Sequence, residues 1–296
     1  MASNFFTPQV SGLFYRPNYY TLVSNVDLNK IRAIEYFQNS QYSGLKMAET
    51  LEFYTKRYVQ QLFDFKDVNS NTVIADIGAG FGWLSMAFVF STEAKVIAVD
   101  PNKERLDAAQ EIAEILGVRD RIDWRVGRLG SLPLDDKEAE VVYCIEVLEH
   151  VYRDRKAIPD LCRVSADLLI LTTPNLWFPV IAHDTRLPFC HWLPVSLRKP
   201  YAKLFKRENE ENDNLFWSPL SLRKYMNGYK PVSKWLHYSS LKRFKETYPF
   251  YLPYGNGLYV EKIGFFKNMY YEIISKLGMY SHYLSPSLSY VFRRKN

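Results

Sequence analysis

Residues 72–82 read Thr72-Val-Ile-Ala-Asp76-Ile-Gly78-Ala-Gly80-Phe-Gly82, and this stretch decides the fold. A β-branched run ends in an acid, and glycines follow at every second position. A second apolar run, Lys95-Val-Ile-Ala-Val-Asp100, ends in another acid 24 residues after the first. The order predicts strand, tight glycine turn, helix and strand. Glycine is needed where the backbone turns sharply beside a ligand, and the following helix directs its N–H groups there. We therefore expect a nucleoside-containing cofactor at the carboxyl ends of a parallel sheet.

The spacing of the glycines narrows the choice of cofactor. A dinucleotide fingerprint, Gly-x-Gly-x-x-Gly, would place its third glycine at Trp83, which argues against an NAD enzyme. The pattern Asp76-x-Gly78-x-Gly80-x-Gly82 instead resembles the first motif of class I S-adenosylmethionine (SAM)-dependent methyltransferases, of the type 11/12 group. Further blocks resemble that family in order and spacing; they are Val99-Asp100-Pro-Asn102, Gly127-Arg128-Leu129, Leu132-Pro133-Leu134, Glu140 to Val151, and Asp167 to Asn175.

The resemblance implies which residues bind SAM. Asp100 would accept hydrogen bonds from the ribose, and Glu146 would lie near the cofactor. The full set of expected cofactor-binding residues is Asp76, Gly78, Ala79, Gly80, Asp100, Pro101, Arg128, Leu129 and Glu146. The family often carries an acid where this chain has Arg128. Asp123 or the backbone near Leu129 would then have to bind the adenine amino group.

The resemblance and the alternation of segments predict an α/β, Rossmann-like sheet of seven mostly parallel strands with helices on both faces. We expect strands near 72–77, 95–100, 121–126, 139–145, 166–172, 231–238 and 287–292, the last one antiparallel. Apolar spacing predicts helices over 44–63, 102–116 and 261–280. We divide the chain into an N-terminal helical extension or lid (1–65), a SAM-binding core (66–175), an α-rich aromatic cap inserted after strand 5 (176–230), and the end of the sheet with a second aromatic insertion (231–296).

Composition sets broader limits. The net charge of +6 permits an anionic partner without requiring one. Three cysteines without paired spacing favour a reducing compartment, and no signal-peptide pattern or long apolar run is present, so we expect a cytoplasmic protein. The 261–280 helix carries lysines beside its apolar stripe. Core packing is the favoured interpretation, and peripheral contact with an anionic membrane is the alternative.

A candidate metal site follows the fourth strand. If Glu146-x-x-Glu149-His150 is helical, its three side chains share one face. The segment resembles metal-dependent O-methyltransferases acting on RNA 3′ ends or on polyprenyl catechols, which implies Mg²⁺ or Mn²⁺. Metal-free members of the wider family carry the same residues, with the histidine packing or capping, and we favour that interpretation.

The cap offers candidate bases for removing a proton from a hydroxyl acceptor. His183 with Asp184 is the first choice, because it lies eight residues past the predicted exit of strand 5. His191 and His150 are the other candidates. A surface or packing role is the plain alternative for each histidine.

We predict O-methylation of a hydroxyl on a sugar, glycan or glycosylated metabolite, since an aromatic, basic cap suits a polar ring. The acceptor could also be a small molecule that is phosphorylated or lipid-linked. An RNA-end O-methyltransferase and a non-catalytic SAM-binding partner protein are alternatives, with nucleic acid the less favoured partner. The sequence assigns no oligomeric state.

Overall fold

The computed structural model describes residues 17–151, 156–181, 185–207, 216–247 and 264–295. Its centre is a seven-stranded sheet in the order β3-β2-β1-β4-β5-β7-β6. The strands are β1 (Val73–Ile77), β2 (Lys95–Asp100), β3 (Ile122–Val126), β4 (Ala139–Ile145), β5 (Ser165–Pro174), β6 (Tyr229–Pro231) and β7 (Ser287–Arg294). Strands β1 to β5 run parallel, and β7 runs antiparallel to both β5 and β6. The predicted α/β fold class is confirmed.

Most strands lie within two residues of their predicted limits, because apolar β-branched runs bounded by turns suit buried parallel strands. The strand expected at 231–238 is the exception. The strand ends at Pro231, and only the N–H of Val232 still donates to β7, at the carbonyl of Val291. The next residues turn back, and Trp235 and Tyr238 are buried in a separate cluster with Phe244 and Ile274.

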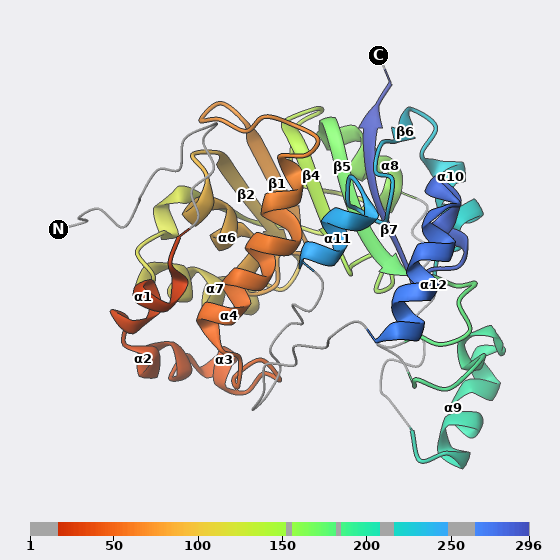
Figure 1. Cartoon of the computed structure of the whole chain (residues 1–296). Helices are drawn as coiled ribbons and strands as arrows, with labels where there is room; N and C mark the ends of the chain where they lie inside the picture. The colour runs from red at the N-terminus through yellow and green to blue at the C-terminus, as the bar shows by residue number, and fades with distance from the viewer. Residues whose placement is uncertain (1–16, 152–155, 182–184, 208–215, 248–263, 296) are drawn as a thin grey trace.

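Helices cover both faces of the sheet (Figure 1). One face carries α4 (Met47–Tyr54), α6 (Trp83–Ser91) and α7 (Lys103–Ile115), and the other carries α8 (Ala157–Val164) and α10 (Pro219–Tyr225). Side chains cap two of these helices: the Asn102 side chain accepts a hydrogen bond at the start of α7, and Ser218 forms a capping box before Pro219.

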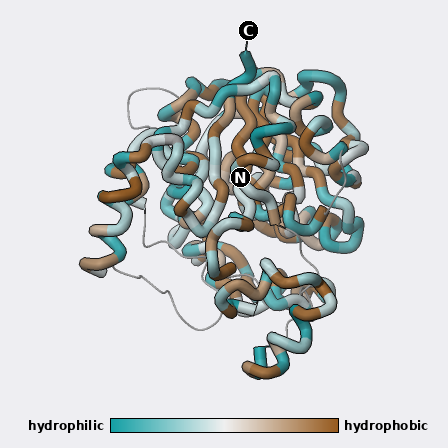
Figure 2. The backbone as a smooth tube through the Cα atoms, turned by 90° about the vertical axis from the view of Figure 1, so that its right-hand side faces the viewer, coloured by the Kyte–Doolittle hydropathy of each residue, from teal (hydrophilic) through white to brown (hydrophobic). Residues whose placement is uncertain are grey.

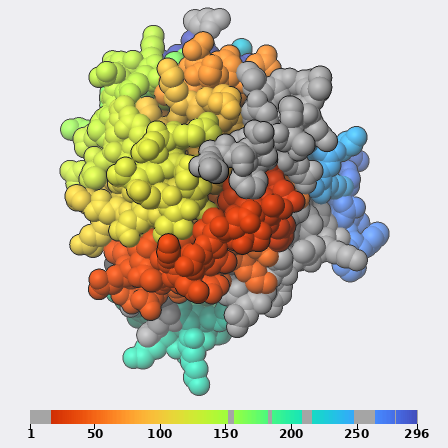
Figure 3. Space-filling model, turned by 90° about the vertical axis from the view of Figure 1, so that its left-hand side faces the viewer, coloured from red at the N-terminus to blue at the C-terminus, as the bar shows by residue number. Residues whose placement is uncertain are grey.

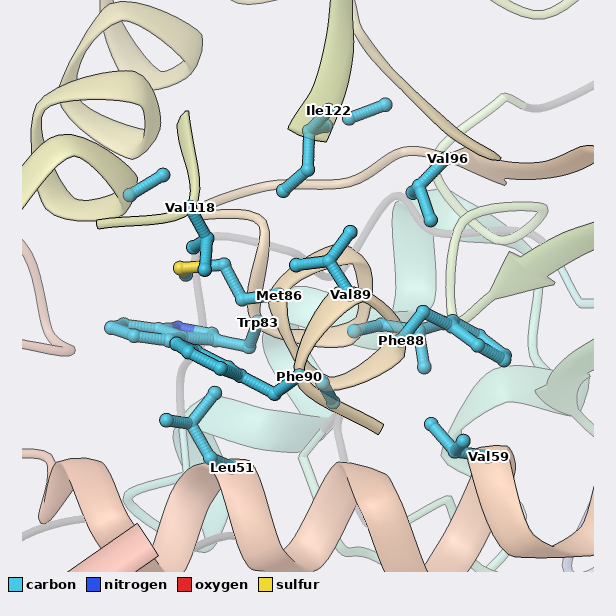
Figure 4. Packing of buried hydrophobic residues seen from close by; sticks show 14 of the residues in the cluster. Leu51, Val59, Trp83, Met86, Phe88, Val89, Phe90, Val96, Val118 and Ile122 are labelled. Carbon is cyan, nitrogen blue, oxygen red and sulfur yellow. The ribbon is translucent and has the colours of Figure 1, made fainter. Parts of the chain in front are cut away.

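Helix α6 is buried along its whole length, since every residue from Trp83 to Ser91 is inaccessible. Figure 4 shows why: side chains of α6 lie between Val96 and Ile122 of the sheet and Leu51 and Val59 of the outer helix. A helix that is apolar on all sides is stable only in such an interior. The glycine loop before α6 therefore rests on a rigid support.

The helix predicted over 44–63 is present in three pieces. They are α4, a π-helical turn (Thr55–Val59, η1) and α5 (Gln60–Leu62). A π-helical turn inserts one extra residue into the helical repeat, and such turns are frequent at functional sites. Three short helices precede α4: α1 (Tyr19–Ser24), α2 (Leu28–Arg32) and α3 (Glu35–Gln38). Figure 3 shows these N-terminal helices (red) lying against α7 and its neighbours (yellow).

Two further regions follow β5. The described part of the cap contains η3 (Cys190–Trp192) and α9 (Val195–Leu204), and the later insertion contains α11 (Leu241–Thr247), α12 (Phe265–Ser275) and η4 (Gly278–Tyr283). Within the described ranges, no helix is both long and apolar enough to cross a membrane.

Candidate active site

The carboxyl ends of the parallel strands form the lower edge of the sheet in Figure 1, with α1–α3 at one side and α9 at the other. Three adjacent strands bring acids to this edge. Asp76 lies near the end of β1, Asp100 ends β2, and Glu146 directly follows β4. Ligands of open α/β sheets bind at this edge, where neighbouring crossovers leave the sheet in opposite directions.

The glycine loop is shaped by steric limits on both sides. Gly78, Gly80 and Gly82 all have positive φ angles, of 78°, 59° and 72°. A side-chain carbon on Gly78 would come within 2.3 Å of the Val147 side chain after β4, whereas one on Gly80 would meet nothing within 4 Å. The N–H groups of Gly78 and Ala79 donate to the carbonyl of Val99. The loop is thus fixed against β2 and β4 and remains open above Gly80.

Asp76 is an internal support rather than an exposed ligand. Its carboxylate is buried and accepts a hydrogen bond from the Ser85 hydroxyl at 2.7 Å. Burial raises the pKa of Asp76 to about 6. The hydrogen bonds from Ser85 lower this pKa, and the nearby charge of Asp100 raises it, but burial has the largest effect. The bond to Ser85 ties β1 to the first turn of α6.

Asp100 is 1% exposed and already accepts several hydrogen bonds. Its Oδ2 accepts from the N–H of Gly80 at 2.9 Å, and its Oδ1 accepts from the N–H of Asn102 at 2.9 Å. The Arg105 guanidinium also reaches Oδ1, with its two nitrogens at 2.9 and 3.3 Å. Arg105 was not singled out in the sequence, although its place in the first turn of α7 brings it back toward the end of β2.

These residues fit the ribose of SAM. A carboxylate has about four acceptor positions, and the bonds just described leave one position open on Oδ2. Leu129 is buried beside Val99 in one apolar cluster, where an adenine could be covered. Pro101 and Arg128 are exposed at the same edge. Asp123 cannot bind the adenine, because it lies at the second residue of β3, away from the carboxyl edge, and pairs with Arg125.

The β4 exit does not form the helix on which a metal site was predicted. Glu146 has a φ of 53°, and the chain then turns. Glu149 is 4% exposed and accepts from the Thr173 hydroxyl at 3.1 Å, while His150 is exposed. Among the described residues, no three His, Cys, Asp or Glu side chains are grouped as metal ligands. The turn places Glu149 in the interior and His150 at the surface, so the candidate Mg²⁺ or Mn²⁺ site lacks the shared helix face on which it depended.

Glu146 and Glu149 instead form a carboxyl pair. Burial raises the pKa of Glu149 well above its ordinary value, and the charge of Glu146 and a hydrogen bond between the two side chains raise it further. Burial and the neighbouring charge thus both favour the neutral form of Glu149, which can donate a hydrogen bond to Glu146. The backbone N–H of Glu146 donates to the carbonyl of Thr172 at 2.9 Å, which holds the pair at the sheet edge.

Arg57 approaches this pair from the π-helical turn. Burial opposes its charge, but the neighbouring Tyr58, Tyr238 and Glu146 outweigh burial and raise its pKa. Its guanidinium carbon lies 5.5 Å from the ring centre of Phe53 and 5.8 Å from that of Tyr58. The buried Nε of Arg57 has no hydrogen-bond partner among the described residues. Sequence reasoning did not single out Arg57, because its importance depends on neighbours that are distant along the chain.

The candidate bases of the cap separate into two cases. His183 and Asp184 lie outside the described residues. His191 is buried in the cap, its Nε2 lies 3.1 Å from the carbonyl oxygen of Leu176, and burial lowers its pKa. Its ring packs edge-on against Phe216. The bond to Leu176 gives His191 a packing role in holding the cap to the end of β5.

A cleft of about 470 Å³ lies among the N-terminal helices rather than at the strand ends. It is lined by residues of α1, α2 and the start of α4, and Phe37 of α3 is one of its walls. The same Phe37 packs edge-on against Phe81 of the glycine loop at 5.2 Å. The hydroxyl of Tyr36 accepts a hydrogen bond from Asn102. Helix α3 therefore contacts both the cleft and the cofactor edge.

Comparisons with known proteins agree with this geometry. Residues 74–167 match a family model described as a methyltransferase domain. An uncharacterized methyltransferase of Schizosaccharomyces pombe is 29% identical over 200 residues, covering 61% of this chain and 74% of that protein. The norajmaline N-methyltransferase of Rauvolfia serpentina is 33% identical over 93 residues, covering 31% of each chain.

Among solved structures, a geranyl diphosphate methyltransferase in complex with SAM aligns with a TM-score of 0.49 and 14% identity, over 90% of this chain and 94% of that one. The matched family segment contains the glycine loop, the acid that ends β2 and the carboxyl pair after β4. The match of that segment, the methyltransferase relatives and the geometry of the cofactor residues together support a class I SAM-dependent methyltransferase.

Proposed function

We propose that the enzyme methylates a hydroxyl oxygen of a sugar, on a glycan or a glycosylated metabolite. The observation that carries the proposal is the Glu146–Glu149 carboxyl pair at the β4 exit. A hydroxyl acceptor must lose its proton as its oxygen attacks, and a positioned carboxylate can accept that proton. A buried carboxyl group whose pKa is shifted by a neighbouring charge is common at acid–base sites, and Glu149 is such a group. We assign Glu146 as the base and Glu149 as the residue that positions it.

The cofactor supplies an electrophilic methyl group on a positively charged sulfur. Asp100 would hold the ribose, the loop around Gly80 would face the rest of the cofactor, and Leu129 would cover the adenine. Much of the rate of such a displacement comes from holding acceptor and donor in line. Arg57 adds a positive charge near Glu146.

Exposed aromatic rings near the exit of β5 support a ring-shaped acceptor. Trp177 packs against Tyr283 with ring centres 5.3 Å apart, and Trp192 donates its indole N–H to the carbonyl of Leu176. Trp177 and Trp192 remain 39% and 51% exposed. Exposed apolar surface of this kind often marks a binding groove, and flat rings suit the C–H faces of a sugar.

The test uses labelled SAM and a panel of free sugars, nucleotide-linked sugars, lipid-linked sugars and short RNAs. Glu146→Gln should lower turnover on a hydroxyl acceptor by about 10²–10⁴-fold, the usual contribution of a general base. Its affinity for S-adenosylhomocysteine (SAH) should remain that of the parent. The matched control is Glu140→Gln on β4, which removes an acid far from the carboxyl edge. Full turnover by Glu146→Gln would refute the base assignment.

The same panel separates the alternatives. The RNA-end alternative depends on three metal ligands that share a helix face. If the enzyme methylates a sugar in the presence of EDTA and does not methylate RNA, that alternative is contradicted. A nitrogen acceptor, of the kind named for the Rauvolfia serpentina relative, attacks through a neutral amine and would be insensitive to Glu146→Gln. SAH binding without turnover on any acceptor would indicate a non-catalytic partner protein.

A further inference from the structure

Two helices beyond the β7 edge of the sheet expose apolar side chains. Figure 1 places α9 and α12 on this side, away from β3, and Figure 2 views the molecule from it. On α9 and just after it, Leu197, Leu204 and Phe205 are 52%, 77% and 52% exposed. On α12, the most exposed apolar residues are Phe265, Phe266 and Ile273. These residues form two separate patches, one on α9 and one on α12, which we call together the α9–α12 surface; it includes the lysines and the arginine described next.

Helix α12 is not the core helix that its sequence favours. Its inner face packs Tyr271 and Ile274 against Trp235 and Phe244. The opposite stripe is formed by residues at helical spacing, namely Phe266, Met269, Ile273 and Leu277, and all four are exposed. An amphipathic helix normally keeps its apolar residues on the covered side and polar residues on the other, whereas α12 has apolar residues on both its inner face and its outer stripe. The outer stripe therefore needs an apolar environment that this chain does not supply among its described residues.

The charged side chains on and after α9 are all cationic, whereas α12 carries Lys267 and also the exposed Glu272, which pairs with Lys245. Residues 185–207 contain six Lys or Arg and no Asp or Glu. Lys199, Lys203, Lys206 and Arg207 are exposed. No ion pair of these four cations occurs among the described residues. Beside α12, the chain from residue 273 to its end also lacks any acid and includes Lys276. The cationic stretch ends at Arg207, because an acidic run begins at Glu208, outside the described residues.

The shape favours a bilayer over a protein partner. Helix α9 is the lowest element in Figures 1 and 2, and hydrophobic and hydrophilic residues alternate near its free end in Figure 2. Protruding apolar residues ringed by cations suit the boundary between headgroups and acyl chains. Protein interfaces instead deplete lysine near their centres. Anionic lipids attract such cations within the Debye length.

We propose that the α9–α12 surface rests on a membrane rich in anionic lipid. Leu204, Phe205 and the α12 stripe would enter the acyl boundary, and Lys199, Lys203, Lys206 and Arg207 would contact the lipid phosphates. The carboxyl edge of the sheet lies on the same side of the molecule as α9, so an acceptor held at the membrane could reach it. The proposal concerns where the enzyme is located and does not depend on the chemistry of the acceptor.

The test is co-sedimentation of the full chain with vesicles of phosphatidylcholine alone or mixed with phosphatidylglycerol. We expect binding only to the mixed vesicles, and loss of binding when salt is raised from about 0.1 M to about 1 M. Lys203→Ala with Lys206→Ala should weaken binding by about five-fold per cation removed. Lys95→Ala with Lys103→Ala, which removes the same charge at the other side of the sheet, should bind like the parent.

The apolar part is tested separately. Leu204→Ser with Phe205→Ser, and independently Phe266→Ser with Ile273→Ser, should each weaken vesicle binding by more than about tenfold. All variants should keep the parent affinity for SAH, which shows that they fold. Equal binding to both vesicle types, or no binding to either, overturns the proposal. So does a concentration-dependent dimer in sedimentation velocity that the serine variants abolish, because the surface would then pair with a second copy.

Discussion

The ion pair between Arg105 and Asp100 competes with the cofactor for the same carboxylate. The side chain of Asp100 is 2% exposed and that of Arg105 is 35% exposed. A ribose diol that donates both hydroxyls to Asp100 needs one position on each oxygen, and Arg105 fills Oδ1 with two donors. We therefore expect Arg105→Met to bind SAH more tightly than the parent.

The size of the effect follows from the exposure of the two partners. An exposed pair contributes about 0–1 kcal/mol and a fully buried one about 3–5 kcal/mol when broken. Only Asp100 is buried, and solvent screens the charge of Arg105. Displacing Arg105 from Asp100 on SAH binding should therefore cost about 1–2 kcal/mol, which corresponds to about 5–30-fold in the Kd for SAH. The same change should lower the stability of the cofactor-free enzyme by a similar amount.

Isothermal titration with SAH at neutral pH measures the difference, and Lys103→Met on the same helix is the control. Lys103 is also paired with an acid, Asp107, but is 71% exposed, so its variant should bind SAH like the parent. An unchanged or weaker affinity in Arg105→Met would refute the reasoning. It would show that Arg105 stays on Asp100 and that the ribose uses Oδ2 alone.

Two further predictions address the loop and the interior. Gly78→Ala should lose stability and SAH affinity, because its φ of 78° is strained for alanine and its new carbon would meet Val147 at 2.3 Å. Gly117→Ala is the control, because Gly117 has a φ of 73° but a new side-chain carbon there would meet no described atom within 4 Å. Its free energy of unfolding in urea should fall only by the strain of about 1–2 kcal/mol. Equal losses in the two variants would show that the clash with Val147 has no effect. His282 is fully buried, neither ring nitrogen has a hydrogen-bond partner in the part of the chain that the structure describes, and burial lowers its pKa to about 3. In the unfolded chain His282 is protonated below about pH 6.5, whereas in the folded state it stays neutral down to about pH 3. The free energy of unfolding therefore decreases as the pH is lowered through that window. Between about pH 7 and 5 the parent should lose about 2 kcal/mol more than His282→Phe, and parallel losses would show that His282 does not titrate on unfolding.

The strands and caps could be predicted closely because their signals are local. The apolar runs that end at Asp76 and Asp100, the Asn102 cap and the Ser218-Pro219 start each depend on neighbours within a few residues. The cofactor class could be predicted for the same reason, since the glycine spacing and the acid that ends β2 are adjacent in sequence. Burial and exposure could not be predicted for α12, because periodicity identifies an apolar face without identifying what covers it.

The sequence by itself determined the order of the strands, the glycine loop and the enzyme family. Only the tertiary structure decided which partners the functional side chains have. The backbone turns after Glu146, so the candidate metal ligands do not share a helix face. The π-helical turn places the charge of Arg57 near that glutamate. The tertiary structure also bonded His191 to a backbone carbonyl and set Arg105 on Asp100. The physical reason is that each of these contacts depends on the three-dimensional packing of side chains and on the local path of the backbone, which residue spacing in the sequence does not specify.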